Sequence, residues 1–396
     1  MNNKIPDFDR IIDRSNSPAE KWNKPAMLRL FGRDDLLPFW VADMEFQVPN
    51  TVQKNLVSRA KNGIFGYEYK QDSLYQSIIQ WYAIRHHWKI DRSHLCFSRG
   101  ILNAIATLIN IHTEEGDGII IQPPVFFEFR LIIRDNNRNI IRNPLKIVDG
   151  KYGIDYDDLE EKASDSKTKM LILCNPHNPV SRVWTKDELK RVGEICLRHN
   201  VFIVTDEIHG DFVFNGHHYT PFASISIEIA QNSVTCISPA KTFNIAAVTD
   251  GFVIIPNEKY REQYNVFTKR LIIHKTNAFS VVAIETAYRS GSEWLDHLLD
   301  YLQDNINYIR TYLGERIPKV KLVNPEGTFL IWLDFRQLGM DVKELESFLA
   351  QKAGIALNSG YWFGRQGAGY ARMTIACPKS MIVEGLDKLA NAIKNI

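Results

Sequence analysis

Three polar residues of this chain have the types and the order that chemistry on an aldehyde cofactor requires. Lys241 lies in SPAKTFNIAA, after Asp206 in TDEIH and after Asn178 in NPHNP. A lysine amine can form a Schiff base with an aldehyde. An aspartate at the end of a buried strand can keep a pyridine nitrogen protonated, which makes the ring an electron sink. An asparagine can donate to the ring's phenolic oxygen. Together these residues predict a site for pyridoxal 5'-phosphate (PLP), with Lys241 as the catalytic residue.

Short runs of β-branched residues indicate the strands that would position these side chains. The runs lie at 118–122, 170–174, 201–205, 234–237 and 252–255, each bounded by turn residues. Helical patterns alternate with them from residue 51 onward, which is typical of an α/β fold with a mostly parallel sheet between helices. Thr185 and Glu188 form a capping box at the start of one crossover helix.

The alternation of short apolar runs with helical patterns ends after residue 285. A long helical pattern leads into GTFLIWLDF, VKELESFLAQKAG, YARMTIA and a last amphipathic helix, which indicates a separate α+β lobe. We therefore expect a large PLP-binding domain at 51–285 and a small C-terminal domain at 286–396. Residues 1–50 are expected to form an N-terminal segment that packs with the small domain.

Asp206 and Asn178 both follow apolar strands, and open α/β sheets bind ligands at the carboxyl ends of their strands. We assign Asp206 to the pyridine nitrogen, with a helix cap or a surface acid as the alternative, and treat Glu207 as a structural partner. Asn178 is assigned to the phenolic oxygen, with an ordinary Asx turn as the alternative. His209 follows closely enough to contact the same ring, although a structural histidine is the alternative.

The remaining cofactor contacts come from a helix start and an aromatic loop. Gly100 and Ile101 stand where an apolar-periodic helix begins, and backbone N–H groups at such a position can bind a phosphate. Ser238, just before Lys241, can add a hydroxyl to the phosphate. Phe126 in PPVFFEF follows a predicted strand, where its ring can stack on the pyridine, and core packing is the alternative.

Arg372 in YARMTIA is the candidate for binding a substrate carboxylate, because its planar fork of donors matches that group. A buried structural ion pair is the alternative. The preceding FGRQGAG lacks dinucleotide-binding spacing, which argues against a nicotinamide site. His86, His87, His217 and His218 lack ligand spacing, so we expect no metal site.

The composition of the chain limits which partners and which cellular compartment we expect. The net charge is +2 without a basic block, so we expect neither nucleic acid nor a membrane surface as a partner. The five cysteines include no CxxC pair and lie mostly in apolar runs, which indicates free thiols in a reducing cytoplasm. We also expect no signal peptide and no membrane span.

Several longer strings resemble one family over essentially the whole chain: PFWVADMEF, GIFGYEY, CNPHNPVSRVW, TDEIHGDFVF, KTFNIAA, EGTFLIWLDF and YARMTIACP. The family is the fold type I PLP enzymes of the class I/II aminotransferase family, and the nearest resemblance is to its cystathionine β-lyase group of C–S lyases. The resemblance implies a seven-stranded, mostly parallel sheet and a homodimer with both active sites at the subunit interface. It also implies that Tyr67 reaches the neighbouring subunit's cofactor phosphate and that the Ala42 backbone lines the substrate side.

The same resemblance implies the reaction, which is α,β-elimination from an L-cysteine S-conjugate such as cystathionine to give a thiol, pyruvate and ammonia. An aminotransferase is the nearest alternative, and a cofactor-bound regulator that keeps the lysine is an alternative of another class. The chain departs from the group's usual pattern at Phe126, where a tyrosine is common, and at Ser181, Ala240, Ala247 and Gly251.

Overall fold

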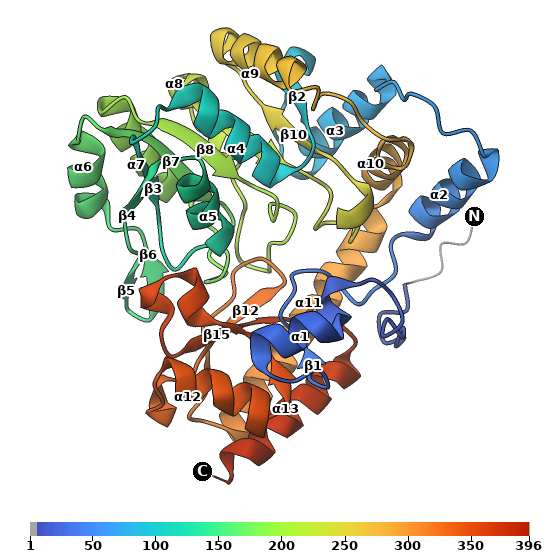
Figure 1. The fold of residues 1–396 in the computed structure, drawn as a ribbon, viewed down its shortest axis with the longest axis vertical. Helices are drawn as coiled ribbons and strands as arrows, with labels where there is room; N and C mark the ends of the chain where they lie inside the picture. The colour runs from blue at the N-terminus through green and yellow to red at the C-terminus, as the bar shows by residue number, and fades with distance from the viewer. Residues whose placement is uncertain (1–5, 396) are drawn as a thin grey trace.

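A central sheet carries the larger lobe of the protein in this computed structural model, which describes residues 6–395 (Figure 1). Within that range seven strands form the sheet, in the spatial order β2 (Leu95–Ser98), β10 (Gly251–Ile254), β9 (Ser233–Ile237), β8 (Phe202–Asp206), β7 (Thr168–Cys174), β3 (Gly118–Ile121) and β4 (Asn139–Arg142). Parallel pairing joins β4, β3, β7, β8 and β9, whereas β10 is antiparallel to both of its neighbours. The expected mostly parallel sheet of seven strands is confirmed.

The apolar runs become strands because both faces of this sheet are covered. In β7, Met170 and Ile172 pack into the apolar cluster on one face, and Leu171 and Leu173 pack into the cluster on the other. Successive side chains of a strand point to opposite faces, so a strand covered on both sides must be apolar throughout. Because of this requirement, such strands can be predicted from continuous hydrophobic runs in the sequence.

Helices supply the two covering layers. The cluster on one face includes side chains of α4 (Ile101–His112), α5 (Phe127–Asp135) and α9 (Glu258–Arg270). The cluster on the other face includes α6 (Tyr156–Ser164), α7 (Lys186–Arg198) and α8 (Ile227–Gln231). A third group packs around β2 and β10: α2 (Asn50–Asn62), α3 (Asp72–Arg85) and α10 (Ala278–Ser290).

The C-terminal part of the chain forms an antiparallel sheet in the order β11 (Lys321–Leu322), β12 (Leu330–Asp334), β15 (Tyr370–Thr374) and β14 (Asn358–Ser359). Its helices are α11 (Ser292–Arg316), α12 (Val342–Ser347) and α13 (Lys379–Ile393). A short hairpin, β5 (Lys146–Val148) with β6 (Lys151–Gly153), belongs to the part of the chain before it.

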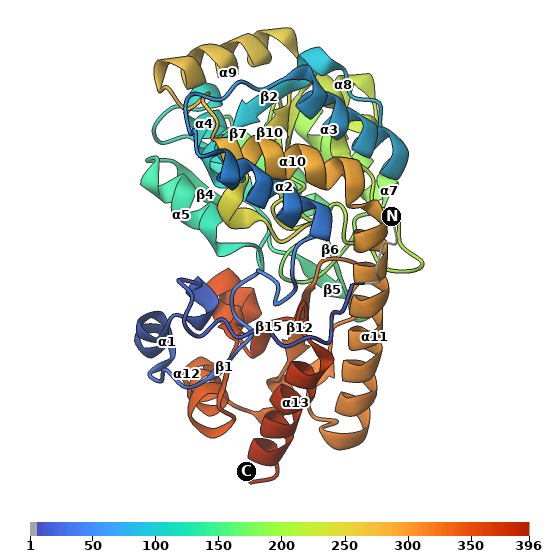
Figure 2. The ribbon, with the colours of Figure 1, turned by 90° about the vertical axis from the view of Figure 1, so that its right-hand side faces the viewer.

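The N-terminal segment lies against these C-terminal elements rather than against the central sheet. Figures 1 and 2 both place α1 (Lys24–Phe31) and β1 (Leu37–Pro38) beside them, and β1 pairs in parallel with β13 (Ile355–Ala356). The domain boundaries at 50 and 285 stay a prediction, and residues 1–5 of the predicted N-terminal segment lie outside the described residues.

Two findings bear on the composition. All five cysteines are buried free thiols, which confirms the prediction made from their apolar surroundings. Among the helices of residues 6–395, none combines the length and apolar character needed to cross a membrane.

We predict that Thr185→Ala lowers the free energy of unfolding by about 1 kcal/mol, the usual cost of losing an N-cap. The Thr185 hydroxyl accepts from the Glu188 N–H at 3.2 Å, and the Glu188 carboxylate accepts from the Thr185 N–H at 2.8 Å. Urea unfolding followed by circular dichroism measures the change. Lys186→Ala, one residue further along α7, is the control and should leave the urea midpoint within error of wild type. Equal effects of the two substitutions would contradict the cap.

Candidate active site

Asp206 ends the central strand β8, so its carboxylate faces the carboxyl edge of the parallel sheet. The side chain is buried, at 5% exposure, and accepts a hydrogen bond from the Ile208 N–H at 3.1 Å. Burial raises the pKa of Asp206 to about 6, while the Ile208 bond and the Lys241 charge act in the opposite direction. A positively charged N–H group that donates to Asp206 would therefore stabilise its ionised carboxylate.

Lys241 lies in a turn shortly after β9, the strand beside β8. Its Nζ donates to the carbonyl oxygen of Ala42 at 2.7 Å, so the Ala42 backbone lies beside Lys241. Burial, followed by the charge of Arg372, lowers the pKa of Lys241 to about 8, although Asp43 and Asp206 act the other way. The amine thus loses its proton far more readily than an exposed lysine.

Arg372 lies in β15, and the sheet register places Asn358 of β14 opposite it. Its guanidinium donates to Asn358 Oδ1 at 2.6 and 3.2 Å, to the Trp40 carbonyl at 3.0 Å and to Asn178 Oδ1 at 3.1 Å. The side chain is 3% exposed, and within residues 6–395 no carboxylate forms an ion pair with it. Burial lowers the pKa of Arg372 to about 9. The structure therefore does not show the buried ion pair that was the alternative for this arginine.

Asn178 joins the two lobes at this point. It lies in the loop after β7, and its amide oxygen accepts from Arg372 of the C-terminal sheet. Because the oxygen is committed to Arg372, the amide nitrogen is the group left to donate toward a ligand. That orientation is the one needed for the predicted bond to a phenolic oxygen.

The predicted phosphate end contains a helix start with open backbone donors. Gly100 has φ 144° and ψ 167°, a conformation that favours glycine, and it precedes Ile101 at the start of α4 without a side-chain cap. A Cβ built on Gly100 would meet nothing within 4 Å, so there is open space beside this helix start. The Ser238 hydroxyl donates to the Asp250 carbonyl at 2.9 Å, and it would have to exchange this bond to reach a phosphate.

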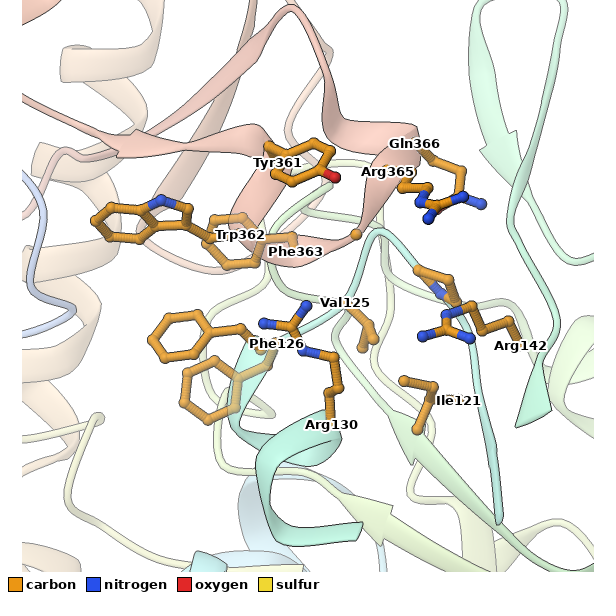
Figure 3. Close-up of a pocket in the computed structure, with 13 residues that line it drawn as sticks. Ile121, Val125, Phe126, Arg130, Arg142, Tyr361, Trp362, Phe363, Arg365 and Gln366 are labelled. Carbon is orange, nitrogen blue, oxygen red and sulfur yellow. The ribbon is translucent and has the colours of Figure 1, made fainter. Parts of the chain in front are cut away.

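His209 lies close enough to Lys241 and Arg372 for their charges to act on its ring, and Phe126 lines a cavity. The His209 ring is buried between Phe212 and Phe329, and its Nδ1 has no hydrogen-bond partner. Burial, and then the charges of Lys241 and Arg372, hold the pKa of His209 well below its usual range, so the ring is neutral. Phe126 stands before α5 and lines the cavity shown in Figure 3.

Tyr67 lies at the protein surface, unlike the buried residues Asp206, Asn178 and Arg372. It is 98% exposed, with Lys275 Nζ 5.4 Å from its ring centroid. A residue so exposed contacts no buried group of its own chain, so its predicted role depends on a second subunit.

Sequence reasoning missed several groups that hold the site. Asn358 and the Trp40 carbonyl bind Arg372, but no local pattern links them to it, because the bonds depend on register and on packing between lobes. Asp211 accepts hydrogen bonds from Thr242, the residue after Lys241, at 2.6 Å and from His86 at 2.8 Å. The position of Asp211 shortly after TDEIH was the only available signal.

The donor and acceptor set fits PLP. Asp206 is a buried carboxylate with an unusually high pKa, which a pyridinium N–H would lower. Gly100 and Ile101 leave space and backbone donors at a helix start, where a phosphate is favoured. The Lys241 amine is half-buried and, with a pKa of about 8, easily deprotonated, as attack on an aldehyde requires.

Comparison with known proteins shows the family to which the chain belongs. Residues 39–392 match the aminotransferase class I and II family. The cystathionine β-lyase PatB of Bacillus subtilis (strain 168) is 39% identical over 98% of this chain and 99% of its own. The chain therefore belongs to the aminotransferase class I and II family, with the fold type I architecture.

Solved structures show the same fold over nearly the full length. Cystalysin from Treponema denticola, which contains pyridoxal 5'-phosphate, has a TM-score of 0.95 and 34% identity, covering 99% of this chain and all of its own. A PLP-bound protein from Clostridium difficile 630, named provisionally as an aminotransferase, has a TM-score of 0.95 and 46% identity, covering 98% of this chain and all of its own.

We predict that covalent capture of PLP by the cofactor-free protein rises with pH and is half-maximal near pH 8, because only the neutral Lys241 amine attacks. Borohydride trapping followed by mass spectrometry measures the rate. Arg372→Gln should move the midpoint to higher pH, since it removes a positive charge that favours deprotonation of Lys241. Lys241→Ala is the control for capture elsewhere. A rate that keeps rising to about pH 10.4, as for an exposed lysine, would contradict the burial effect.

Proposed function

We propose that this chain is a PLP-dependent C–S lyase that performs α,β-elimination on L-cysteine S-conjugates. One conjugate and one water give one thiol, one pyruvate and one ammonia. The proposal is carried by three residues that come together in one site. Lys241 is easily deprotonated, Asp206 is a buried acid, and Arg372 forms no ion pair with a carboxylate of the described chain. Elimination rather than amino transfer is supported by the relatives named as cystathionine β-lyase and cystalysin.

Each polar residue then has a defined task. PLP, when bound, supplies an electron sink for the pair left on the substrate Cα. Arg372 holds the substrate carboxylate with its planar fork and so fixes the Cα–H bond relative to Lys241. Lys241 Nζ, neutral at mildly alkaline pH, takes the proton from Cα, and the thiolate leaves from Cβ. Asp206 would keep the pyridine nitrogen of bound PLP protonated, and Asn178 would donate to its phenolic oxygen.

The remaining predicted residues hold the cofactor in place. Gly100 and Ile101 would bind the phosphate through backbone N–H groups, and Ser238 would add its hydroxyl. Phe126 would stack on the pyridine ring, and neutral His209 would contact it. Because Phe126 has no hydroxyl, proton transfer in this chain rests on Lys241.

We further propose a homodimer and a cytoplasmic location. Ile64, Phe65, Tyr67 and Tyr69 form an exposed aromatic and aliphatic strip, at 56–98% exposure, of the kind that marks an association surface. Tyr67 of each subunit would reach the cofactor phosphate of the other. The five buried free thiols support a reducing compartment.

An aminotransferase is the second candidate, favoured by the family match and by the Clostridium difficile 630 structure. It would use the same Lys241, Asp206 and Arg372. The two activities differ in the fate of the substrate, since an aminotransferase releases a keto acid that keeps its side chain.

We predict that the holoenzyme releases pyruvate and a thiol from cystathionine over many turnovers, because Cβ of this substrate carries a leaving group. Lactate dehydrogenase coupling and a thiol reagent measure the two products. Lys241→Ala should lower the rate by at least about 10³-fold, since it removes the base and the cofactor link. A single turnover that leaves the cofactor in its amine form, without thiol, would overturn the lyase assignment in favour of amino transfer.

We predict that inactive Lys241→Ala and weakened Tyr67→Ala subunits complement each other when mixed. In a shared-site dimer, one site of each mixed dimer combines an intact Lys241 with an intact Tyr67 from the partner. Random exchange at equal amounts should restore about a quarter of wild-type activity. Pyruvate release before and after subunit exchange measures it. Activity equal to the mean of the separate variants would contradict a shared site.

A further inference from the structure

A cavity of about 460 Å³ lies between the large lobe and the C-terminal part of the chain. One wall comes from the end of β3, the loop after it, α5 and the last residue of β4. The other wall is the segment Tyr361–Gln366, which contains the short helices η7 (Gly360–Phe363) and η8 (Arg365–Gly367). Its volume lies within the range of small-molecule sites.

Three arginines from separate elements line this cavity. Arg130 comes from α5, Arg142 from the end of β4 and Arg365 from η8. Figure 3 shows the three side chains extending into the space between α5 and the Tyr361–Gln366 segment. We call this site the arginine cavity. Three like charges around one concave space repel one another and raise the local attraction for an anion.

No carboxylate of the described chain neutralises these charges. The cavity lining contains neither Asp nor Glu, and the ion pairs found in residues 6–395 do not involve Arg130, Arg142 or Arg365. Some surface arginines are paired, such as Arg33 with Asp35 and Arg198 with Glu160, whereas others, such as Arg29 and Arg316, form no ion pair within the described chain. What distinguishes Arg130, Arg142 and Arg365 is that three unpaired arginines line one cavity.

Glu128 is the carboxylate nearest to Arg130 in the sequence, and it is not paired with the cavity arginines either. Glu128 precedes Arg130 on α5 but does not line the cavity. Among the described residues, Glu128 forms no ion pair with Arg130, Arg142 or Arg365.

The arginine cavity adjoins the candidate active site through two aromatic walls. Phe126, the proposed stacking residue, lines the cavity. Phe363 also lines it, and the Arg372 guanidinium lies 4.9 Å from the Phe363 ring centroid. Ile121 and Val125 add an apolar surface between the aromatic walls and the arginines. A substituent that passes Phe126 and Phe363 would therefore meet a hydrophobic surface first and cations beyond it.

We propose that the arginine cavity binds an anionic oxyacid group at the far end of the substrate's sulfur substituent. This inference rests on the proposed function, since it names the class of conjugate that the lyase prefers. Arg372 holds the α-carboxylate, the apolar walls contact the thioether chain, and the three arginines bind the distal carboxylate. The preferred substrates are thus S-carboxyalkyl cysteines rather than neutral S-alkyl cysteines.

The test compares S-(2-carboxyethyl)-L-cysteine with its amide, S-(2-carbamoylethyl)-L-cysteine, which has the same shape without the charge. The holoenzyme should favour the carboxylate by roughly 10- to 100-fold in kcat/KM, the range of a charge-assisted hydrogen bond. Most of the difference should lie in KM, and added salt should reduce it, because the arginines are exposed. The ratio for the wild-type protein needs no variant and so does not depend on how a variant folds.

Variants locate the effect. The combined Arg130→Gln, Arg142→Gln and Arg365→Gln substitutions should bring the carboxylate-to-amide ratio close to one. Arg134→Gln is the matched control, since Arg134 lies on the same helix, pairs with Asp135 and does not line the cavity. A wild-type ratio near one, a ratio that survives the triple substitution, or an equal loss in Arg134→Gln would each overturn the proposal.

A binding measurement separates this inference from the lyase assignment. Titration of the holoenzyme with each conjugate, followed by the absorbance of the bound cofactor, gives affinity whether or not elimination occurs. Equal affinities, or no binding of either conjugate, overturn the arginine-cavity proposal. A carboxylate preference in binding without pyruvate release overturns the lyase assignment alone.

Discussion

Two cations, the buried Arg372 and the half-buried Lys241, lie in one site, and within residues 6–395 neither forms an ion pair with a carboxylate. Leaving charges desolvated and unpaired costs several kcal/mol each, so the fold must offset that cost with oriented dipoles. It does so with the carbonyl of Ala42 and with the amide oxygen of Asn358, among others. The site keeps an excess of positive charge, which an anionic cofactor and a substrate carboxylate would neutralise.

The backbone of residues 40–46 depends on a second charge cluster beneath it. Lys21, fully buried, bonds to Asp43 at 2.7 Å and to Glu45 at 2.9 Å, and Asn244 forms hydrogen bonds with the same segment. This segment supplies carbonyls to both cations. Because β1 just before it pairs with β13 of the C-terminal part, the N-terminal segment connects both lobes at the site.

The buried Arg372 and the exposed arginines of the arginine cavity act on anions in different ways. The Arg372 fork is buried and fixed by neutral acceptors, so it can select a carboxylate by geometry. Arg130, Arg142 and Arg365 lie at an exposed cavity, where charge acts over a longer range and is screened by salt. The aromatic side chain of Phe363 separates the two kinds of cation.

The sequence by itself determined five strands of the central sheet and the positions of Asp206 and Asn178 at or after the ends of two of them, because local apolar patterns fix where strands start and stop. It also predicts Lys241 as the reactive amine. Only the tertiary structure decided that Asn358 binds Arg372. It alone also decided that the Lys241 pKa falls to about 8 and that three surface arginines converge on one cavity. Burial, strand register and the packing of one lobe on another join residues far apart in the chain, and no local pattern specifies those distances.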